Sequence, residues 1–194
     1  FPVSMARGAT FDRELEEEIG KVIGAEVRAV GGNYFGGVCI NLPRNPRWGR
    51  AQECYGEDQY HLGEMGAALT RGVQSQNVMA CIKHFALNNA RFKADVQISK
   101  RALHEVFLPH FKRCIEEGAA SVMGAYNKVL GEQASESSFL LRDILRDKWG
   151  FEGFTLSDFL WAVKDGVKGV KGGMNIEMPC FCRYLEDIPK ALED

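Results

Sequence analysis

The sequence predicts an α/β fold, a (β/α)8 TIM-like barrel that is incomplete in this chain. Short apolar segments such as VMACIKHF at 78–85 are continuous, which is typical of parallel strands buried on both faces. Segments with helical spacing of apolar residues lie between them, so strands and helices alternate. About six strand–helix units are expected, whereas a complete barrel has eight. A doubly wound open sheet fits the same alternation.

The first half of the chain begins with an expected strand end at 1–5. A helix is expected at 12–30, because apolar residues recur there at helical spacing after the candidate N-caps Thr10 and Asp12. The apolar segment GGVCIN predicts a buried strand at 36–41. A Pro-, Arg- and Gly-rich loop is expected next, at 42–58, followed by a helix at 59–74. A strand at 78–85 and a polar loop at 88–97 then complete this half.

The second half continues the alternation. A helix is expected at 100–117, because Leu103, Phe107 and Phe111 recur at helical spacing. The other expected elements are strands at 119–125, 153–156 and 174–178, a loop at 126–138, and helices at 139–149, 159–170 and 184–192. The glycine stretch GGNYFGG precedes a strand, so it is interpreted as a helix-to-strand turn and not as a dinucleotide-binding loop.

Charge and motifs exclude several classes of function. The formal net charge is −2, so no basic surface for nucleic acid or an anionic membrane is expected. No apolar run approaches the ~20 residues that cross a bilayer. The four histidines lack metal-binding spacing, and no phosphate-binding loop or serine nucleophile elbow is present. Neither a metal nor a cofactor is therefore expected.

The six cysteines are interpreted as reduced structural thiols. Cys39, Cys81 and Cys114 lie in apolar or amphipathic segments. Cys180 and Cys182 form C-x-C, which is neither zinc-ribbon nor thioredoxin-like spacing. This usage slightly favours a cytoplasmic location, with a secreted or periplasmic one still open. The chain opens without an initiator Met or a signal-peptide pattern.

Polar and aromatic side chains collect where the expected strands end. Arg50 follows the strand at 36–41 in the loop PRWGR, Lys83 and His84 follow VMACI, and Tyr126 follows SVMGA. Asp158 and Trp161 follow GFTL, and Glu177 stands in the last strand segment. Carboxyl ends of parallel strands share one rim, so these side chains should converge. Such a mixture suits a neutral, hydroxyl-rich ligand, with hydrogen bonds to hydroxyls and aromatic cover for a sugar ring.

Each of these residues also has a structural interpretation. Asp158 could be the N-cap of the helix expected at 159–170. Lys83 could extend its ammonium to solvent beside a hydrogen-bonded His84. The Arg and Trp side chains of PRWGR could stack within their own loop. Their placement at successive strand ends favours a shared site over these separate roles.

Five motifs in order strongly resemble the N-terminal barrel of family 3 glycoside hydrolases: NPRWGRAQECYGED, KHFALN, GAYNKVLGE, LRDILRDKWGFEGFTLSDFLW and GMNIEMP. The resemblance runs from Phe1 to about Ala191. It implies that residues 1–194 form most of that barrel. The first barrel unit, the last unit and a second α/β sandwich domain would then lie outside this chain. It also implies a retaining, exo-acting, β-glucosidase-like glycosidase, which cleaves terminal non-reducing β-linked sugars through a covalent glycosyl-Asp intermediate.

The resemblance assigns roles to individual residues. Asp158 would be the catalytic nucleophile, and Tyr126 would lie beside it. Arg50, Lys83 and His84 would bind sugar hydroxyls in the −1 subsite, and Trp161 would form a wall. The substrate would be an oligosaccharide or a β-glucoside, and a Glu of the second domain would be the acid/base. A homo-oligomer is also compatible with the resemblance. KHFALN lacks the second histidine of the K-H-F-P-G-H-G type, which argues against the N-acetylglucosaminidase branch.

Two expectations about geometry and ionisation follow, and two differences from the family stand beside them. Neighbouring strand residues point to opposite faces, so Lys83 and His84 can touch one sugar only if the backbone there is distorted, as by a non-prolyl cis peptide. Lys83 and Arg50 should lower the pKa of Asp158. The loop at 89–93 is shorter than in similar members, and Asn175 stands where the family commonly has Asp.

Two other functions remain as alternatives. One is a non-catalytic carbohydrate-binding member or fragment of the same family, because no carboxylate of this chain fills the acid role. The other is an unrelated barrel enzyme such as an aldo-keto reductase or an amidohydrolase, which the absence of metal and phosphate motifs disfavours. The choice between glucose and xylose depends on one hydroxymethyl group, for which the sequence shows no determinant.

Overall fold

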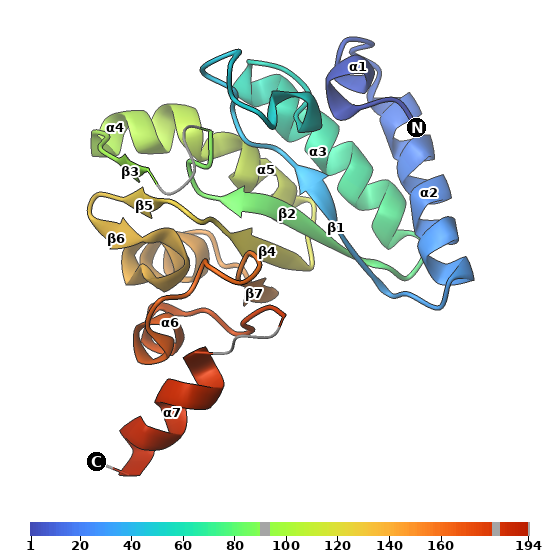
Figure 1. Cartoon of the computed structure of the whole chain (residues 1–194). Coiled ribbons are helices and arrows are strands. Elements are labelled where there is room, and N and C mark those ends of the chain that lie inside the picture. The colour runs from blue at the N-terminus through green and yellow to red at the C-terminus, as the bar shows by residue number, and fades with distance from the viewer. Residues whose placement is uncertain (90–93, 180–182, 194) are drawn as a thin grey trace.

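The computed structural model describes residues 1–89, 94–179 and 183–193, and it contains a parallel sheet of four strands (Figure 1). The strand order is β1-β2-β4-β7, and each neighbouring pair is parallel. The strands are β1 (Tyr34–Cys39), β2 (Met79–Phe85), β4 (Ser121–Gly124) and β7 (Phe154–Leu156). An isolated parallel bridge joins Leu156 to Ile176. Neighbours in the main sheet follow chain order with helices between them, which is the arrangement of an incomplete TIM-like barrel and confirms the predicted fold class.

Helices fill the connections between the strands. The α-helices are α1 (Ser4–Gly8), α2 (Arg13–Ala29), α3 (Gln59–Gln74), α4 (Lys100–Ala102), α5 (Pro109–Glu116), α6 (Gly166–Gly172) and α7 (Arg183–Glu193). Short 3-10 turns cover Ala51–Glu53 and Ala134–Glu136, and π-helical segments cover Leu103–Phe107 and Phe139–Lys148. A small second sheet is built from β3 (Asp95–Val96), β5 (Lys128–Val129) and β6 (Glu132–Gln133).

Helices α2 and α3 begin and pack as their sequences dictate. Asp12 accepts a hydrogen bond from the Leu15 amide and so caps α2, while Asp58 caps α3 in the same way. The two helices approach closely at glycines, because a Cβ on Gly72 would lie 2.2 Å from the Glu17 carbonyl oxygen. Helix α3 in turn packs on β1, β2 and α5.

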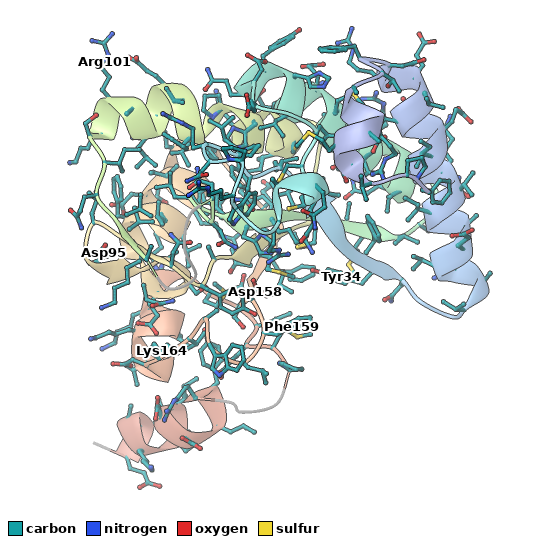
Figure 2. All side chains as sticks on the ribbon, turned by 45° about the horizontal axis from the view of Figure 1, so that its top comes forward. Tyr34, Asp95, Arg101, Asp158, Phe159 and Lys164 are labelled. Carbon is teal, nitrogen blue, oxygen red and sulfur yellow. The ribbon has the colours of Figure 1, made fainter. Side chains whose placement is uncertain are left out.

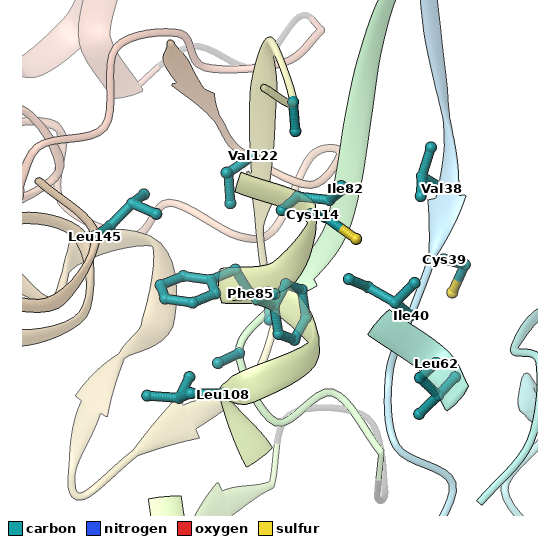
Figure 3. Packing of buried hydrophobic residues seen from close by; sticks show 14 of the residues in the cluster. Val38, Cys39, Ile40, Leu62, Ile82, Phe85, Leu108, Cys114, Val122 and Leu145 are labelled. Atoms are coloured by element: carbon teal, nitrogen blue, oxygen red, sulfur yellow. The ribbon is translucent and has the colours of Figure 1, made fainter. Parts of the chain in front are cut away.

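The sheet is buried on both faces. The larger cluster joins strand residues such as Val38, Ile82 and Val122 to the helices (Figure 3). In this cluster Phe85 packs edge-on to Phe111. Alternate strand residues form a second cluster of Cys81, Met123 and Leu156 on the opposite face. Two-sided burial explains why the strands are continuous apolar segments.

The four cysteines that the structure describes are free and buried, namely Cys39, Cys54, Cys81 and Cys114. Cys180 and Cys182 lie outside the described residues. Among the described helices, none combines the length and the apolar composition that a bilayer crossing needs.

Two predicted elements are wrong. Residues 1–5 are not a strand: α1 begins at Ser4, and Phe1 and Val3 are exposed, because three apolar positions with no neighbouring strand cannot form a buried ladder. The helix expected at 159–170 begins only at Gly166, where Asp165 is the N-cap.

The segment after Asp158 has other hydrogen-bond partners than a helix would give it. The Ser157 amide donates to the Ile176 carbonyl, and the Leu160 amide donates to the Met178 carbonyl. Leu160 also has a φ of 68°, in the left-handed region. These long-range bonds hold the segment against residues 176–178, which form one bridge and not the full strand expected at 174–178.

Three other predictions need refinement. The loops expected at 88–97 and 126–138 contain the short strands of the second sheet, and residues 90–93 of the first loop lie outside the described residues. The helix expected at 100–117 is divided by the π-helical segment before Pro109, since a proline cannot continue the helical hydrogen-bond ladder.

Candidate active site

The end of β2 carries Lys83 and His84, and its backbone departs from a regular strand. The peptide bond Lys83–His84 is cis, as predicted, and so is Phe85–Ala86. The pairing with β4 shifts register between Lys83 and Phe85. The imidazole Nε2 of His84 lies 3.5 Å from the Asp158 carboxylate oxygen Oδ2 at the end of β7.

Asn41, just beyond β1, holds His84. Its Oδ1 accepts from the His84 amide at 3.0 Å and lies 2.8 Å from the imidazole Nδ1. Its Nδ2 donates to the His84 carbonyl oxygen at 3.0 Å. Both side chains are almost completely buried. Burial, with Arg50 and Lys83 nearby, lowers the pKa of His84 well below its usual value, so the imidazole is neutral near pH 7 and the 3.5 Å contact is not an ion pair.

Asp158 lies at the end of β7, with only 7% of its surface exposed (Figure 2). Its Oδ1 accepts a hydrogen bond from the Phe159 amide at 2.8 Å. Its Oδ2 is buried and has no hydrogen-bond partner among the described residues. Asp158 does not cap a helix, so the structural alternative for this residue is wrong. One oxygen is therefore held in place while the other is available to a ligand.

The pKa of Asp158 is raised above its usual value, which corrects the expected direction. Burial is the largest cause, and it outweighs the opposite effects of the Phe159 amide, the Tyr126 hydroxyl and the cations Arg50 and Lys83. The sequence shows the nearby cations, but it does not show how far the fold removes the carboxylate from water. Arg50 and Lys83 do lower the pKa of Asp158, as predicted, but burial raises it by more.

Arg50 comes from the loop after β1, where it forms a bidentate pair with Glu53. Its Nε and Nη2 donate to the two carboxylate oxygens at 2.7 Å and 2.9 Å. This pairing is the main cause of the lowered pKa of Glu53 and of the raised pKa of Arg50. Asp158 also contributes to the raised pKa of Arg50, which places the guanidinium within the electrostatic range of the site.

Tyr126 and Trp161 stand side by side at the outer part of the site, with ring centroids 6.5 Å apart. The Tyr126 hydroxyl donates to the Phe159 carbonyl oxygen at 2.8 Å. Burial, followed by the Asp158 charge, raises the pKa of Tyr126. Half of the Trp161 surface is exposed, so its ring can meet a ligand.

The structure places His84 beside Asp158 and Tyr126 beside Trp161 at the strand ends, with Arg50 and Lys83 near enough to act on the pKa of Asp158. It adds two residues that were not assigned roles. Asn41 holds His84, and Glu53 holds Arg50. The sequence signal that could have identified Asn41 is its position at the end of a strand. Glu177 has a structural role, since its carboxylate accepts from the amides of Arg183 and Tyr184 at the start of α7. Among the described residues, no group of three or more candidate ligands could hold a metal ion.

Asn175 also has a structural role at the end of the sheet. Its Oδ1 accepts from the Thr155 amide and hydroxyl and from Arg146. An amide oxygen supplies the acceptor that this position needs. The difference from the family's usual Asp therefore leaves these bonds intact.

Comparisons with known proteins agree on one family. The model of the glycosyl hydrolase family 3 N-terminal domain matches residues 1–194. Beta-glucosidase BoGH3A of Bacteroides ovatus is 40% identical over 95% of this chain, and thermostable beta-glucosidase B of Acetivibrio thermocellus is 38% identical over 92%. The chain spans about a quarter of these relatives, 25% and 24% of their lengths.

Solved structures give the same result. Beta-glucosidase 3B from Thermotoga neapolitana, in complex with glucose, has a TM-score of 0.95 and 40% identity, covering 100% of this chain and 28% of its own. A Bifidobacterium adolescentis family 3 beta-glucosidase has a TM-score of 0.94 at 33% identity, covering 100% of this chain and 29% of its own. From its sequence, its sheet and its strand-end side chains, this chain belongs to glycosyl hydrolase family 3 and corresponds to the family's N-terminal domain.

Proposed function

We propose that the intact protein is a retaining, exo-acting β-glucosidase-type glycosidase, and that this domain supplies its nucleophile and its −1 subsite. The observation that carries the proposal is the buried Oδ2 of Asp158, which lacks a hydrogen-bond partner among the described residues. This Oδ2 atom lies 3.5 Å from the His84 Nε2, and the positive charges of Arg50 and Lys83 act on the Asp158 carboxylate. The beta-glucosidases among the relatives support the same reaction class.

In this mechanism Oδ2 of Asp158 attacks the anomeric carbon. The new Oδ2–carbon bond forms as the bond to the leaving oxygen breaks, and an acid donates a proton to that oxygen. Water, deprotonated by the same group, then attacks the anomeric carbon and releases the sugar and the carboxylate. The Phe159 amide keeps Oδ1 in place throughout, so the carboxylate presents one fixed nucleophilic oxygen.

The acid must come from another part of the intact protein. Glu53 lies in the site, but its pairing with Arg50 lowers its pKa, so it is ionised at neutral pH and cannot donate a proton. In a retaining enzyme the acid would lie about 5–5.5 Å from the nucleophile. We assign this role to a glutamate of a second domain, which agrees with the length of the relatives.

Lys83, Arg50 and His84 would bind the hydroxyls of the sugar, and Trp161 would cover an apolar face of the ring or of the next sugar. Lys83 and Arg50 can only donate hydrogen bonds to hydroxyl oxygens. Their charges also favour the ionised form of Asp158 against the effect of burial. The same cations thus bind substrate and keep the nucleophile reactive.

The test is covalent trapping. The intact protein is incubated with a 2-deoxy-2-fluoro-β-glucoside that carries a dinitrophenolate leaving group, followed by peptide mass mapping. We expect one glycosyl adduct per active site, on Asp158. It should disappear in Asp158→Asn and persist in the matched variant Asp147→Asn, which removes an exposed carboxylate from the segment 139–148. An adduct on another residue would contradict the assignment. Sugar binding without turnover would favour the carbohydrate-binding alternative.

A further inference from the structure

The Asn41 side chain binds His84 at three places: the main-chain amide, the main-chain carbonyl and the imidazole Nδ1. Asn41 and His84 are each 1% exposed, so these groups depend on one another for hydrogen bonds. The two residues are 43 positions apart and come from the ends of neighbouring strands, β1 and β2.

The main chain of His84 determines which way the Asn41 amide points. An N–H can only donate and a carbonyl oxygen can only accept, so Oδ1 must face the His84 amide and Nδ2 must face its carbonyl. The opposite orientation would place two donors together and two acceptors together. Because Oδ1 only accepts, the imidazole Nδ1 that it contacts at 2.8 Å must carry a hydrogen.

We propose that Asn41 is a positioning residue that sets the tautomer of His84, so that Nε2 presents a lone pair to the substrate. His84 then accepts a hydrogen bond from a sugar hydroxyl, whereas Lys83 and Arg50 donate theirs. The substrate part of this inference rests on the proposed function. The tautomer itself rests only on the hydrogen bonds of Asn41.

The surroundings of the imidazole are consistent with this role. The charged groups facing it are Asp158, whose Oδ2 lies 3.5 Å from Nε2, and the cations Arg50 and Lys83. Burial is the largest cause of the lowered pKa of His84, and the two cations add to it. Nε2 is therefore an acceptor that a sugar hydroxyl can satisfy, and the Asp158 Oδ2 beside it stays available to the anomeric carbon.

The first test observes the tautomer without any turnover. Long-range ¹H–¹⁵N spectra of the intact protein with ¹⁵N-labelled histidine report which ring nitrogen is protonated, and His84→Gln identifies the His84 signals by their loss. We expect a protonated Nδ1 and an unprotonated Nε2 at pH 7. A protonated Nε2 in the wild-type protein would overturn the proposal.

The second test changes the partner of Nδ1. Asn41→Asp keeps an acceptor for Nδ1, but its negative charge should raise the pKa of His84 and so protonate Nε2. We expect kcat/KM to fall by about tenfold per pH unit below that raised pKa and to recover above it. Asn127→Asp is the matched control, because Asn127 donates to Ala86 and Lys128 and not to His84. If kcat/KM of Asn41→Asp and of Asn127→Asp falls at the same pH on the acid side, the positioning role of Asn41 is refuted.

The two proposals fail separately. If the Nδ1-protonated tautomer is observed but Asp158 forms no adduct, only the proposed reaction is lost. If the adduct forms but Nε2 is protonated, the reaction stands and the role of Asn41 is wrong.

Discussion

The two sides of the site differ in how firmly the fold holds them. On the β2 side, His84 is 1% exposed and bound by three hydrogen bonds to one residue. On the β7 side, the three residues after Asp158 are exposed, with Phe159 at 46% and Trp161 at 50%, before the chain is buried again at Ala162 and Val163. One side is preorganised by the core, and the other, the open side, carries the exposed rings of Phe159 and Trp161.

This difference indicates that the two sides of the site have different roles. In the proposed reaction His84 must keep one orientation, and it lies on the preorganised side, where no reorganisation is needed when a substrate arrives. Asp158 lies on the β7 side, where burial and the Phe159 amide hold it in place. The side chains of Phe159 and Trp161 are about half exposed, so under the proposed function their rings can contact sugars of differing size. Substitutions on the preorganised side should therefore affect the reaction strongly, and substitutions on the open side should mainly affect binding.

Removing Lys83 should produce the largest change. Lys83→Met in the intact protein should lower kcat/KM by about 10²-fold or more, because a charged donor to the sugar is lost. Lys83 opposes the raised pKa of Asp158, so its loss raises that pKa further, and the acid limb of the pH profile should move to higher pH. Activity needs ionised Asp158, so it would be lost earlier as the pH falls. Lys128→Met, an exposed lysine of β5, should leave the limb in place.

Weakening the Arg50 pair should have an intermediate effect. Glu53→Gln removes the negative charge and one of the two acceptor oxygens that hold the guanidinium, so we expect KM to rise by about tenfold with little change in kcat. Steady-state kinetics of the intact protein would show it, with Glu57→Gln as the exposed control from the same loop. A drop in kcat alone would mean that Glu53 takes part in the chemistry itself.

The smallest effect is expected on the open side. Trp161→Ala should raise KM about two- to tenfold and leave kcat nearly unchanged, because the ring supplies stacking and no charge. Trp161→Phe should keep most of the binding. If Trp161→Ala lowered kcat as strongly as Lys83→Met, the contrast between the two sides would not hold.

Local patterns predicted much of this fold. Hydrophobic periodicity predicted the observed bounds of α3 and placed β1, β2, β4 and β7 within two residues of their observed bounds, because these elements bury continuous apolar stripes. The distortion at Lys83–His84 was predicted from the resemblance together with strand geometry, because neighbouring strand residues that face opposite ways could not otherwise both contact one sugar.

Features that depend on distant residues could not be predicted in this way. Asn41 meets His84 across 43 residues, and the segment after Asp158 is held by carbonyls of Ile176 and Met178. The raised pKa of Asp158 likewise reflects burial by the assembled core, which no local motif records. The sequence therefore predicted which residues lie at the strand ends, but it did not predict their hydrogen bonds or their ionisation.

The bonds between Asn41 and His84 have a consequence for redesign. Two of the three reach the main chain of residue 84, so they do not depend on its side chain, with the exception of proline, which lacks the N–H. A library that varies position 84 to accept altered sugars should therefore retain the strand-end geometry. The same freedom does not extend to position 41, where every substitution removes contacts that the backbone itself requires.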